Sequence, residues 1–154
     1  MSYQRNASTV FAVSMIGTLL AGIALTVQAN DKVAPAPLAL RKIMQEMERN
    51  MQVIINGIPN EDWALVAKMT PLIADHPQPP LGEKLRILGF IGTDAGKFKD
   101  LDKKSNLAAL ALQQAATREN GPGVVAAFTR LQDACNACHQ GFRQSFTEHF
   151  YTQH

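Results

Sequence analysis

The 154-residue sequence is poor in cysteine, in aromatic residues and in net charge, and each shortage narrows the class of protein. Its two cysteines exclude a scaffold held by several disulfides. Aromatic residues are 6% of the chain, which is low for a β-sandwich. Basic and acidic residues number 15 and 13, so the net charge of +2 gives no electrostatic argument for nucleic-acid binding. No segment alternates polar and apolar residues over the length of a strand, so nothing predicts a sheet.

The composition is that of an ordinary globular chain long enough for one domain, with an apolar segment at its N-terminus. Arg5 precedes a run of apolar residues from Val10 to Val27, and small or aliphatic residues lead up to Ala29. This pattern predicts a secretory signal over residues 1–29, cleaved after Ala29, and a domain over residues 30–154. The alternative is a retained membrane anchor, because the run is close to the length that spans a bilayer.

Four further segments carry apolar residues along one face of a helix, and in the first, third and fourth of them the spacing alternates between three and four residues. These residues are Leu40, Met44, Met47, Met51 and Ile54; Leu65, Val66, Met69, Leu72 and Ile73; Phe98, Leu101, Ser105, Ala108, Leu112 and Ala115; and Val124, Phe128, Leu131, Cys135, Cys138 and Phe142, with a weak continuation to Ser145 and His149. The predicted fold is all-α, an antiparallel four-helix bundle.

Turn-forming residues predict where these helices end. Gly57 ends the first, free to adopt the left-handed conformation, and Asn60 caps a second helix that begins at Glu61. Pro71 kinks or shortens that second helix near its end. Residues 75–96 are rich in proline and glycine, so they leave room only for a short helix.

The sharpest motif is Cys135-Asn136-Ala137-Cys138-His139. A Cys-x-x-Cys-His run is the attachment signal of c-type haem. Residues 135 and 138 lie three apart on one face of a helix, so both thiols can reach the two vinyl groups of one porphyrin. His139 lies one turn after Cys135, where its imidazole can approach the iron. Both cysteines fall on the inward face of their helix, which predicts a haem inside the bundle.

Three other kinds of site use the same residue types. A thioredoxin-like redox pair normally opens a helix after a strand, whereas this pair lies mid-helix with no strand before it. A tetrahedral zinc site needs four ligands, and the motif supplies three. A disulfide between residues i and i+3 of a regular helix would be strained. Export also favours haem, because covalent haem attachment takes place outside the bacterial cytoplasm.

With these features the sequence resembles the class II cytochromes c, the family that includes cytochrome c′ and its low-spin relatives. The resemblance rests on an exported chain of this size, the helical pattern and the motif in the last helix, followed by Phe142-Arg143. It implies one covalently attached haem c with iron, a periplasmic location, and Cys135, Cys138 and His139 as its attachment and ligand residues.

A second resemblance concerns the first helix. The segment from Met44 to Ile54, Met-Gln-Glu-Met-Glu-Arg-Asn-Met-Gln-Val-Ile, is similar to the first helix of the soluble periplasmic cytochrome b of the same fold. The first Met of that pattern is the sixth ligand of the iron, so the resemblance assigns this role to Met44. Plain core packing is the other interpretation, and it is the expected role of Met47 and Met51.

The sixth ligand separates two functions. With His139 and Met44 bound, the iron is six-coordinate and low-spin, and the thioether raises the reduction potential, which suits a carrier of single electrons. With no side chain bound, the site is five-coordinate, as in cytochrome c′, and can bind nitric oxide or carbon monoxide. Neither function turns over a substrate, so we do not expect an enzyme.

Propionate groups of a haem attract basic side chains, and Arg41 and Arg143 each lie one turn from an expected ligand. Lys97, Lys99, Lys103 and Lys104 interleave with Asp100 and Asp102 and are either a solvated face or a patch that steers an acidic redox partner. His76 has no partner at a spacing that suggests a second metal. The expected partners are unidentified redox proteins and, as the family allows, a second copy of the chain. No nucleic acid is expected, and a membrane only if the leader is retained.

Overall fold

The computed structural model describes residues 38–151, and this part of the chain is helical without any strand. Its elements are α1 (Ala39–Gly57), α2 (Trp63–Met69), α3 (Pro71–Ala74), α4 (Leu81–Ile91), the 3₁₀ turn η1 (Gly92–Asp94), α5 (Ala95–Thr117), α6 (Gly121–Cys138), the π-helical turn η2 (His139–Arg143) and α7 (Gln144–Tyr151). The expected signal segment, residues 1–29, lies outside the described residues. Within residues 38–151, no helix combines the length and apolarity needed to cross a membrane.

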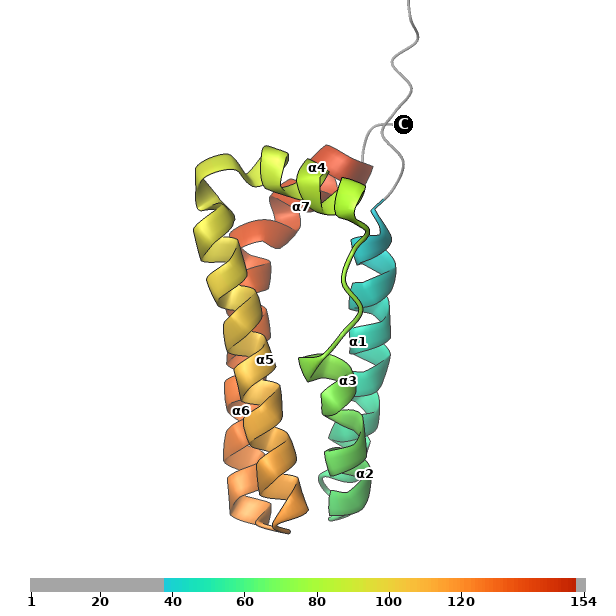
Figure 1. Ribbon diagram of the computed structural model, residues 1–154. Helices are drawn as coiled ribbons and strands as arrows, with labels where there is room; N and C mark the ends of the chain where they lie inside the picture. The colour runs from blue at the N-terminus through green and yellow to red at the C-terminus, as the bar shows by residue number, and fades with distance from the viewer. Residues whose placement is uncertain (1–37, 152–154) are drawn as a thin grey trace, which may run out of the picture. The chain divides into compact units, whose positions relative to one another are not determined.

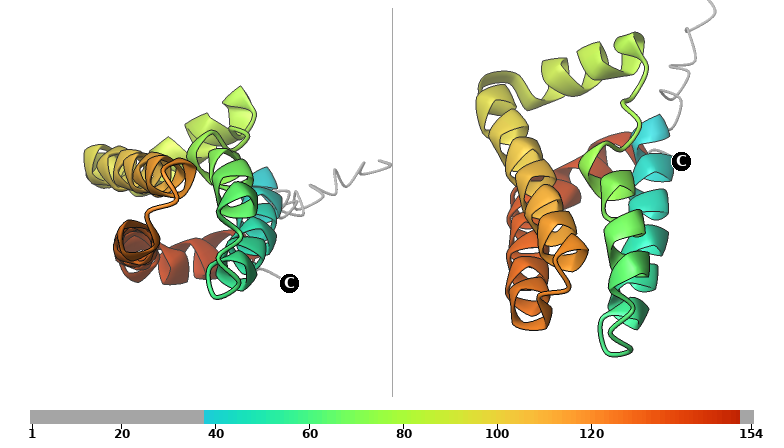
Figure 2. Two further views of the ribbon diagram at one scale, coloured as in Figure 1. Left: turned by 90° about the horizontal axis from the view of Figure 1, so that it is seen from below. Right: turned by 60° about the horizontal axis from the view of Figure 1, so that its bottom comes forward.

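The four legs of the bundle are α1, the α2–α3 pair, α5 and α6, while α4 crosses one end (Figure 1). This arrangement confirms the predicted all-α four-helix bundle. The helix α5 packs against α6 and against α2 and α3, and α1 packs against α2 and α3. Seen along the bundle, α7 turns away from the end of α6 and runs across toward α1 (Figure 2).

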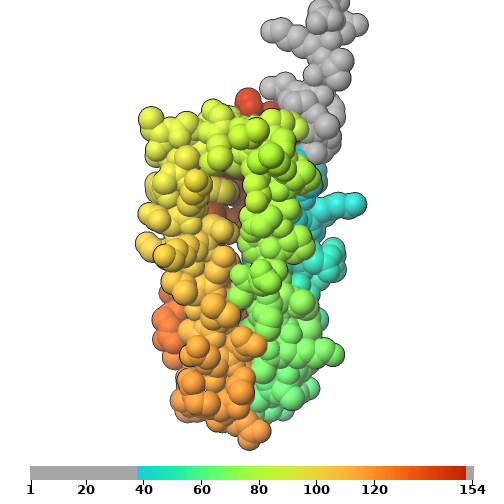
Figure 3. Space-filling view, in the orientation of Figure 1, coloured from blue at the N-terminus to red at the C-terminus, as the bar shows by residue number. Residues whose placement is uncertain are grey.

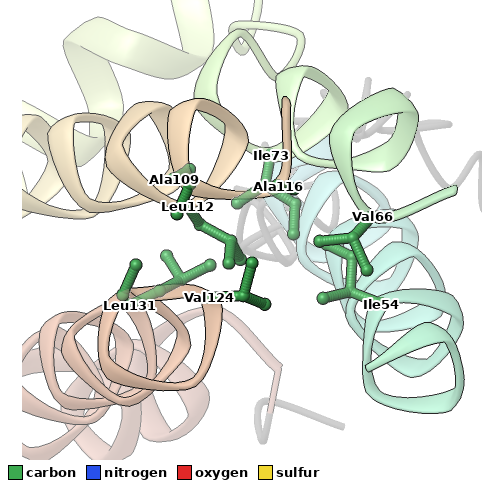
Figure 4. Packing of buried hydrophobic residues seen from close by; sticks show 10 residues of the cluster. Ile54, Val66, Ile73, Ala109, Leu112, Ala116, Val124 and Leu131 are labelled. Carbon is green, nitrogen blue, oxygen red and sulfur yellow. The ribbon is translucent and has the colours of Figure 1, made fainter. Parts of the chain in front are cut away.

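Two separate apolar clusters fill the interior. The lower cluster consists of Ile54, Val66, Ile73, Ala109, Leu112, Ala115, Ala116, Val124, Ala127 and Leu131. In Figure 4, Ile54 and Val66 face Leu112, Val124 and Leu131 across the bundle. The upper cluster, below α4, consists of Leu38, Ile87, Phe142, Phe146 and Phe150. The space between the two clusters is therefore a distinct level of the bundle.

The turn between α1 and α2 differs from the prediction. Asp62, not Asn60, caps α2, and its carboxylate accepts a hydrogen bond from the Leu65 amide at 3.0 Å. The Asn60 side chain instead donates to the carbonyl of Asn56 at 2.7 Å, and Glu61 takes the positive φ of the turn. Gly57 remains helical, so its expected left-handed conformation was wrong. A Cβ there would lie 3.1 Å from Val66 Cγ2, so glycine permits close approach of the two helices.

Other breaks follow the sequence closely. Pro71 begins α3 one residue after α2 ends, which confirms the predicted interruption. The irregular segment contains the short helix α4, whose Glu83 carboxylate caps the start of α1. It accepts from the amides of Ala39 and Leu40 at 2.6 and 2.8 Å. This contact ties the crossing helix to α1 and satisfies two amides that have no partner within their own helix.

The buried face of α1 is rotated about the helix axis from the face that the apolar repeat predicted. The buried residues are Ile43, Asn50, Ile54 and Gly57, whereas the three methionines of the helix are half-buried at its flanks.

The largest difference from the prediction lies at the end of α6. There the π-helical turn η2 holds more residues than an α-helical turn does. The buried residues of this segment are therefore Phe142, Phe146 and Phe150. Ser145 and His149, which the regular repeat placed inward, are exposed.

Candidate functional site

The two thiols of the Cys-x-x-Cys-His motif face different apolar clusters. Cys135 packs against the lower cluster and Cys138 against the upper cluster. Both are half-buried, and they are not joined in a disulfide. The inward orientation predicted for these residues is therefore confirmed. The helical turn that carries the motif spans the level between the clusters.

On α1, as on α6, the residues pass from contact with the upper cluster to contact with the lower cluster. On α1, Leu40 packs against the upper cluster and Met47 against the lower one. Met44 lies between them, half-buried and in neither cluster. We use the term middle layer for the level of Met44, Ser105 and the turn from Cys135 to His139.

On α5 the middle layer is marked by Ser105. This residue is only 8% exposed and lies between Leu101, which packs with the upper cluster, and Ala108, which packs with the lower one. Its hydroxyl donates to the Leu101 carbonyl at 3.2 Å, so the polar group is satisfied within the helix and needs no further partner. A small, satisfied side chain at this position leaves an apolar wall on which a flat ring can rest.

The two helices on opposite sides of the middle layer stand apart from each other. The helices α1 and α6, which carry Met44 and the motif, are not among the closely packed pairs. Figure 3 shows an opening between α5 and the connection from α3 to α4, through which the C-terminal segment is visible. A layer bounded by apolar clusters above and below, with one thiol against each, fits a porphyrin held at two points.

Electrostatics keep the motif's groups uncharged. Burial, the largest effect, raises the pKa of the Cys135 thiol. The pKa of Cys138 is also raised, by burial first, then by the charge of Asp102 and by Cys135. His139 lies exposed at the edge of the layer. Partial burial of its ring, followed by the charge of Arg143, lowers the pKa of the imidazole. A neutral imidazole has the free lone pair that a metal ligand needs.

The two arginines predicted to bind the propionates lie in different surroundings. Arg143 is exposed, within electrostatic reach of His139. Arg41 lies at the start of α1, where its guanidinium carbon is 5.2 Å from the centre of the Tyr151 ring. Two other basic residues also contact aromatic rings: Arg86 lies over Phe150 and Lys97 over Phe142. Among residues 38–151, no three or more His, Cys, Asp or Glu side chains are grouped to hold a metal ion.

One polar pair beside the site was missed by the sequence analysis. His76, in the connection between α3 and α4, is 7% exposed, and its Nε2 lies 3.3 Å from Oδ1 of Asp102 on α5. The sequence places Asp102 in a charged stretch that is either a solvated face or a patch for a redox partner. The partners lie 26 positions apart, so no spacing in a sequence pattern could reveal the pair.

Comparison with known protein families assigns the class. Residues 39–143 match the model of the cytochrome c′ family, and this match covers more than half of the chain. The chain belongs to the cytochrome c′ family, and is thus a haem-binding c-type cytochrome. No curated protein and no solved structure compared with the chain matches it significantly. The family implies a covalently bound c-type haem with iron, and the middle layer, with its two thiols and its imidazole, fits that group.

Proposed function

We propose that this protein is a periplasmic cytochrome that carries single electrons through one haem, with His139 and Met44 as the axial ligands of the iron. The haem, when bound, supplies the one-electron chemistry of Fe(II) and Fe(III). The observation that carries the proposal is the position of Met44. It lies in the middle layer on the helix across from the motif, and it packs into neither apolar cluster.

Each residue of the middle layer has a distinct role in this proposal. Cys135 and Cys138 would attach the porphyrin through two thioethers, because both side chains pack against the interior of the bundle. His139 provides a neutral imidazole from the same turn. Met44 provides a soft thioether, which favours Fe(II) over Fe(III) and raises the reduction potential. The apolar clusters exclude water on both sides, so a change of one charge reorganises little solvent.

The competing function is a five-coordinate site that binds nitric oxide or carbon monoxide. The packing around Met44 also supports this function. Because Met44 is held by neither cluster and α1 does not pack closely on α6, a small ligand could take the place of the thioether. The two functions differ only in whether the Met44 sulfur is bound to iron.

The ferric absorption spectrum of the matured protein tests the choice. We expect a low-spin spectrum with the Met–iron charge-transfer band in the wild type, and loss of that band in Met44→Ala. Met47→Ala is the matched control, because Met47 lies one turn away on the same helix but packs into the lower cluster. A high-spin wild-type spectrum that Met44→Ala leaves unchanged would refute methionine ligation and favour gas binding.

The proposal also includes export, one haem per chain, and a redox protein as partner. Export is supported by the expected signal segment over residues 1–29 and by the family, whose members are typically periplasmic. We propose that the protein turns over no substrate of its own. Mass spectrometry of the protein purified from periplasm tests the export and the haem count together, because cleavage after Ala29 and the addition of one haem each change the intact mass by a known amount.

A further inference from the structure

The most unusual group outside the cofactor's own residues is the buried histidine of the connection between α3 and α4. This connection, residues 75–80, borders the opening seen in Figure 3, and α5 forms the opposite border. His76 extends from the connection to Asp102 on α5, with 3.3 Å between Nε2 and Oδ1. The pair therefore links the two sides of the opening.

The hydrogen-bond geometry identifies the protonation state that suits His76. Its Nδ1 lies 3.1 Å from the carbonyl oxygen of Pro77, and its Nε2 faces the carboxylate of Asp102. Both partners are acceptors only, unless the carboxylate is protonated. Both hydrogen bonds can form together only when each ring nitrogen carries a proton, which is the imidazolium form.

The charges around His76 act in the same direction. The bond to Asp102 is the largest influence and raises the pKa of His76. Burial opposes it, while the Pro77 carbonyl and the charges of Asp102 and Asp75 add to the increase. Asp102 comes from α5 and Asp75 from the connection itself. The neighbouring helix α3, Pro71–Ala74, carries no titratable side chain.

The pair is electrically coupled to the cofactor's attachment point. The charge of Asp102 raises the pKa of the Cys138 thiol, so the carboxylate lies within electrostatic reach of the turn that carries the motif. When His76 is protonated, its positive charge offsets that of Asp102. When His76 loses its proton, the imidazolium no longer offsets the charge of the Asp102 carboxylate, whose side chain is 43% exposed, and a nearby negative charge stabilises Fe(III) over Fe(II).

We propose that the His76–Asp102 pair couples the redox state of the haem iron to the protonation of His76. The coupling needs the haem that the family implies, but not the ligation of Met44. Reduction of the iron by one electron, supplied by a redox protein, is accompanied by uptake of a fraction of a proton from water at His76. No bond to the iron forms or breaks. By linkage, protonation of His76 favours reduction of the iron by a certain factor. Reduction of the iron strengthens the binding of the proton at His76 by the same factor.

The reduction potential therefore falls as the pH rises through the pKa of His76. For one charge acting through a partly solvated interior, we expect about a threefold difference in proton affinity between the two redox states. This factor equals a change of about 30 mV in potential, at about 59 mV for each factor of ten.

The test is a redox titration of the holoprotein at several values between about pH 5 and about pH 9, the range in which histidine titrates. We expect the fall in potential to be lost in His76→Gln and in Asp102→Asn. Two matched variants should retain it: His149→Gln changes an exposed histidine that stacks on Phe90, and Asp100→Asn changes an exposed carboxylate of the same helix. A fall that persists in His76→Gln would overturn the proposal and point to other groups, such as the propionates.

A second measurement needs no variant, and so decides the matter even if a substitution prevents folding. The pKa of His76 is measured by NMR titration of the ring in the oxidised and in the reduced wild-type protein. We expect the higher pKa in the reduced state, with a difference that matches the potential change. Equal pKa values in the two states would overturn the proposal, whichever ligand occupies the sixth position.

Discussion

Two leucines of α5 test whether the helix is oriented as described. Leu112 is completely buried in the lower cluster, while Leu110, two residues away, is 42% exposed. Replacing either with alanine makes the same chemical change in the same helix, so helix propensity cancels in the comparison. The orientation of α5 matters because the same rotation turns Ser105 and Asp102 toward the middle layer.

The expected effects follow from burial. Leu112→Ala removes three buried carbon groups, which at roughly 0.8 kcal/mol each is about 2.4 kcal/mol. The cavity left among close-packed neighbours brings the loss to about 3–4 kcal/mol. Leu110→Ala removes a side chain that already has 42% of its surface in water and leaves no closed cavity, so it should cost only about 1 kcal/mol.

The assay is unfolding of the haem-loaded protein in guanidinium chloride, followed by circular dichroism of the helices. We expect the midpoint of Leu112→Ala to fall well below that of Leu110→Ala, with the same dependence on denaturant. Equal losses in the two variants would mean that α5 is rotated from the described orientation. The assignment of Ser105 and Asp102 to the site would then be wrong as well.

Three further predictions concern the caps, the thiols and the buried histidine. Asp62→Ala should destabilise the fold by about 1 kcal/mol, and Asn60→Ala by clearly less, because only Asp62 caps α2. Denaturant unfolding of both variants measures this difference, and equal losses of stability would contradict the prediction. Haem should remain on the denatured chain in Cys135→Ser or Cys138→Ser alone, but not in the double variant. A haem stain after denaturing electrophoresis shows this, and staining of the double variant would refute attachment at these thiols. The pKa of His76 is raised above its ordinary 6.5, so its stabilising contribution is complete below that value and is lost as the pH rises through the folded-state pKa. The stability of the wild type should therefore fall with rising pH relative to His76→Gln, as unfolding at a series of pH values would show, whereas parallel curves would contradict the bond to Asp102.

The sequence predicted the features of the fold that depend on local chemistry. The spacing of apolar residues located the four legs of the bundle, and Pro71 interrupted the second leg as expected. The motif also fell on the buried side of its helix, as its spacing required. These features are set by residues within one or two turns of each other, so a linear pattern contains them.

The features that the sequence did not reveal depend on distant contacts or on helix geometry. The capping of α1 by Glu83 and the bond from His76 to Asp102 join residues far apart in the chain. The π-helical turn at η2 shifted the buried positions from Ser145 and His149 to Phe146 and Phe150. A regular repeat cannot anticipate this shift. The turn begins at His139, at the site itself, and π-helical turns are frequent at functional sites.

Carbon monoxide binding to the reduced protein tests the central claim most directly, because the gas must compete with any side chain in the sixth position. If Met44 binds the iron, the wild type should bind carbon monoxide about tenfold or more weakly than Met44→Ala, a difference of about 1.4 kcal/mol or more. Met47→Ala, altered one turn away on the same helix, should behave as the wild type does. Equal affinities in the wild type and Met44→Ala would contradict the account, and would identify the protein as a gas-binding member of its family.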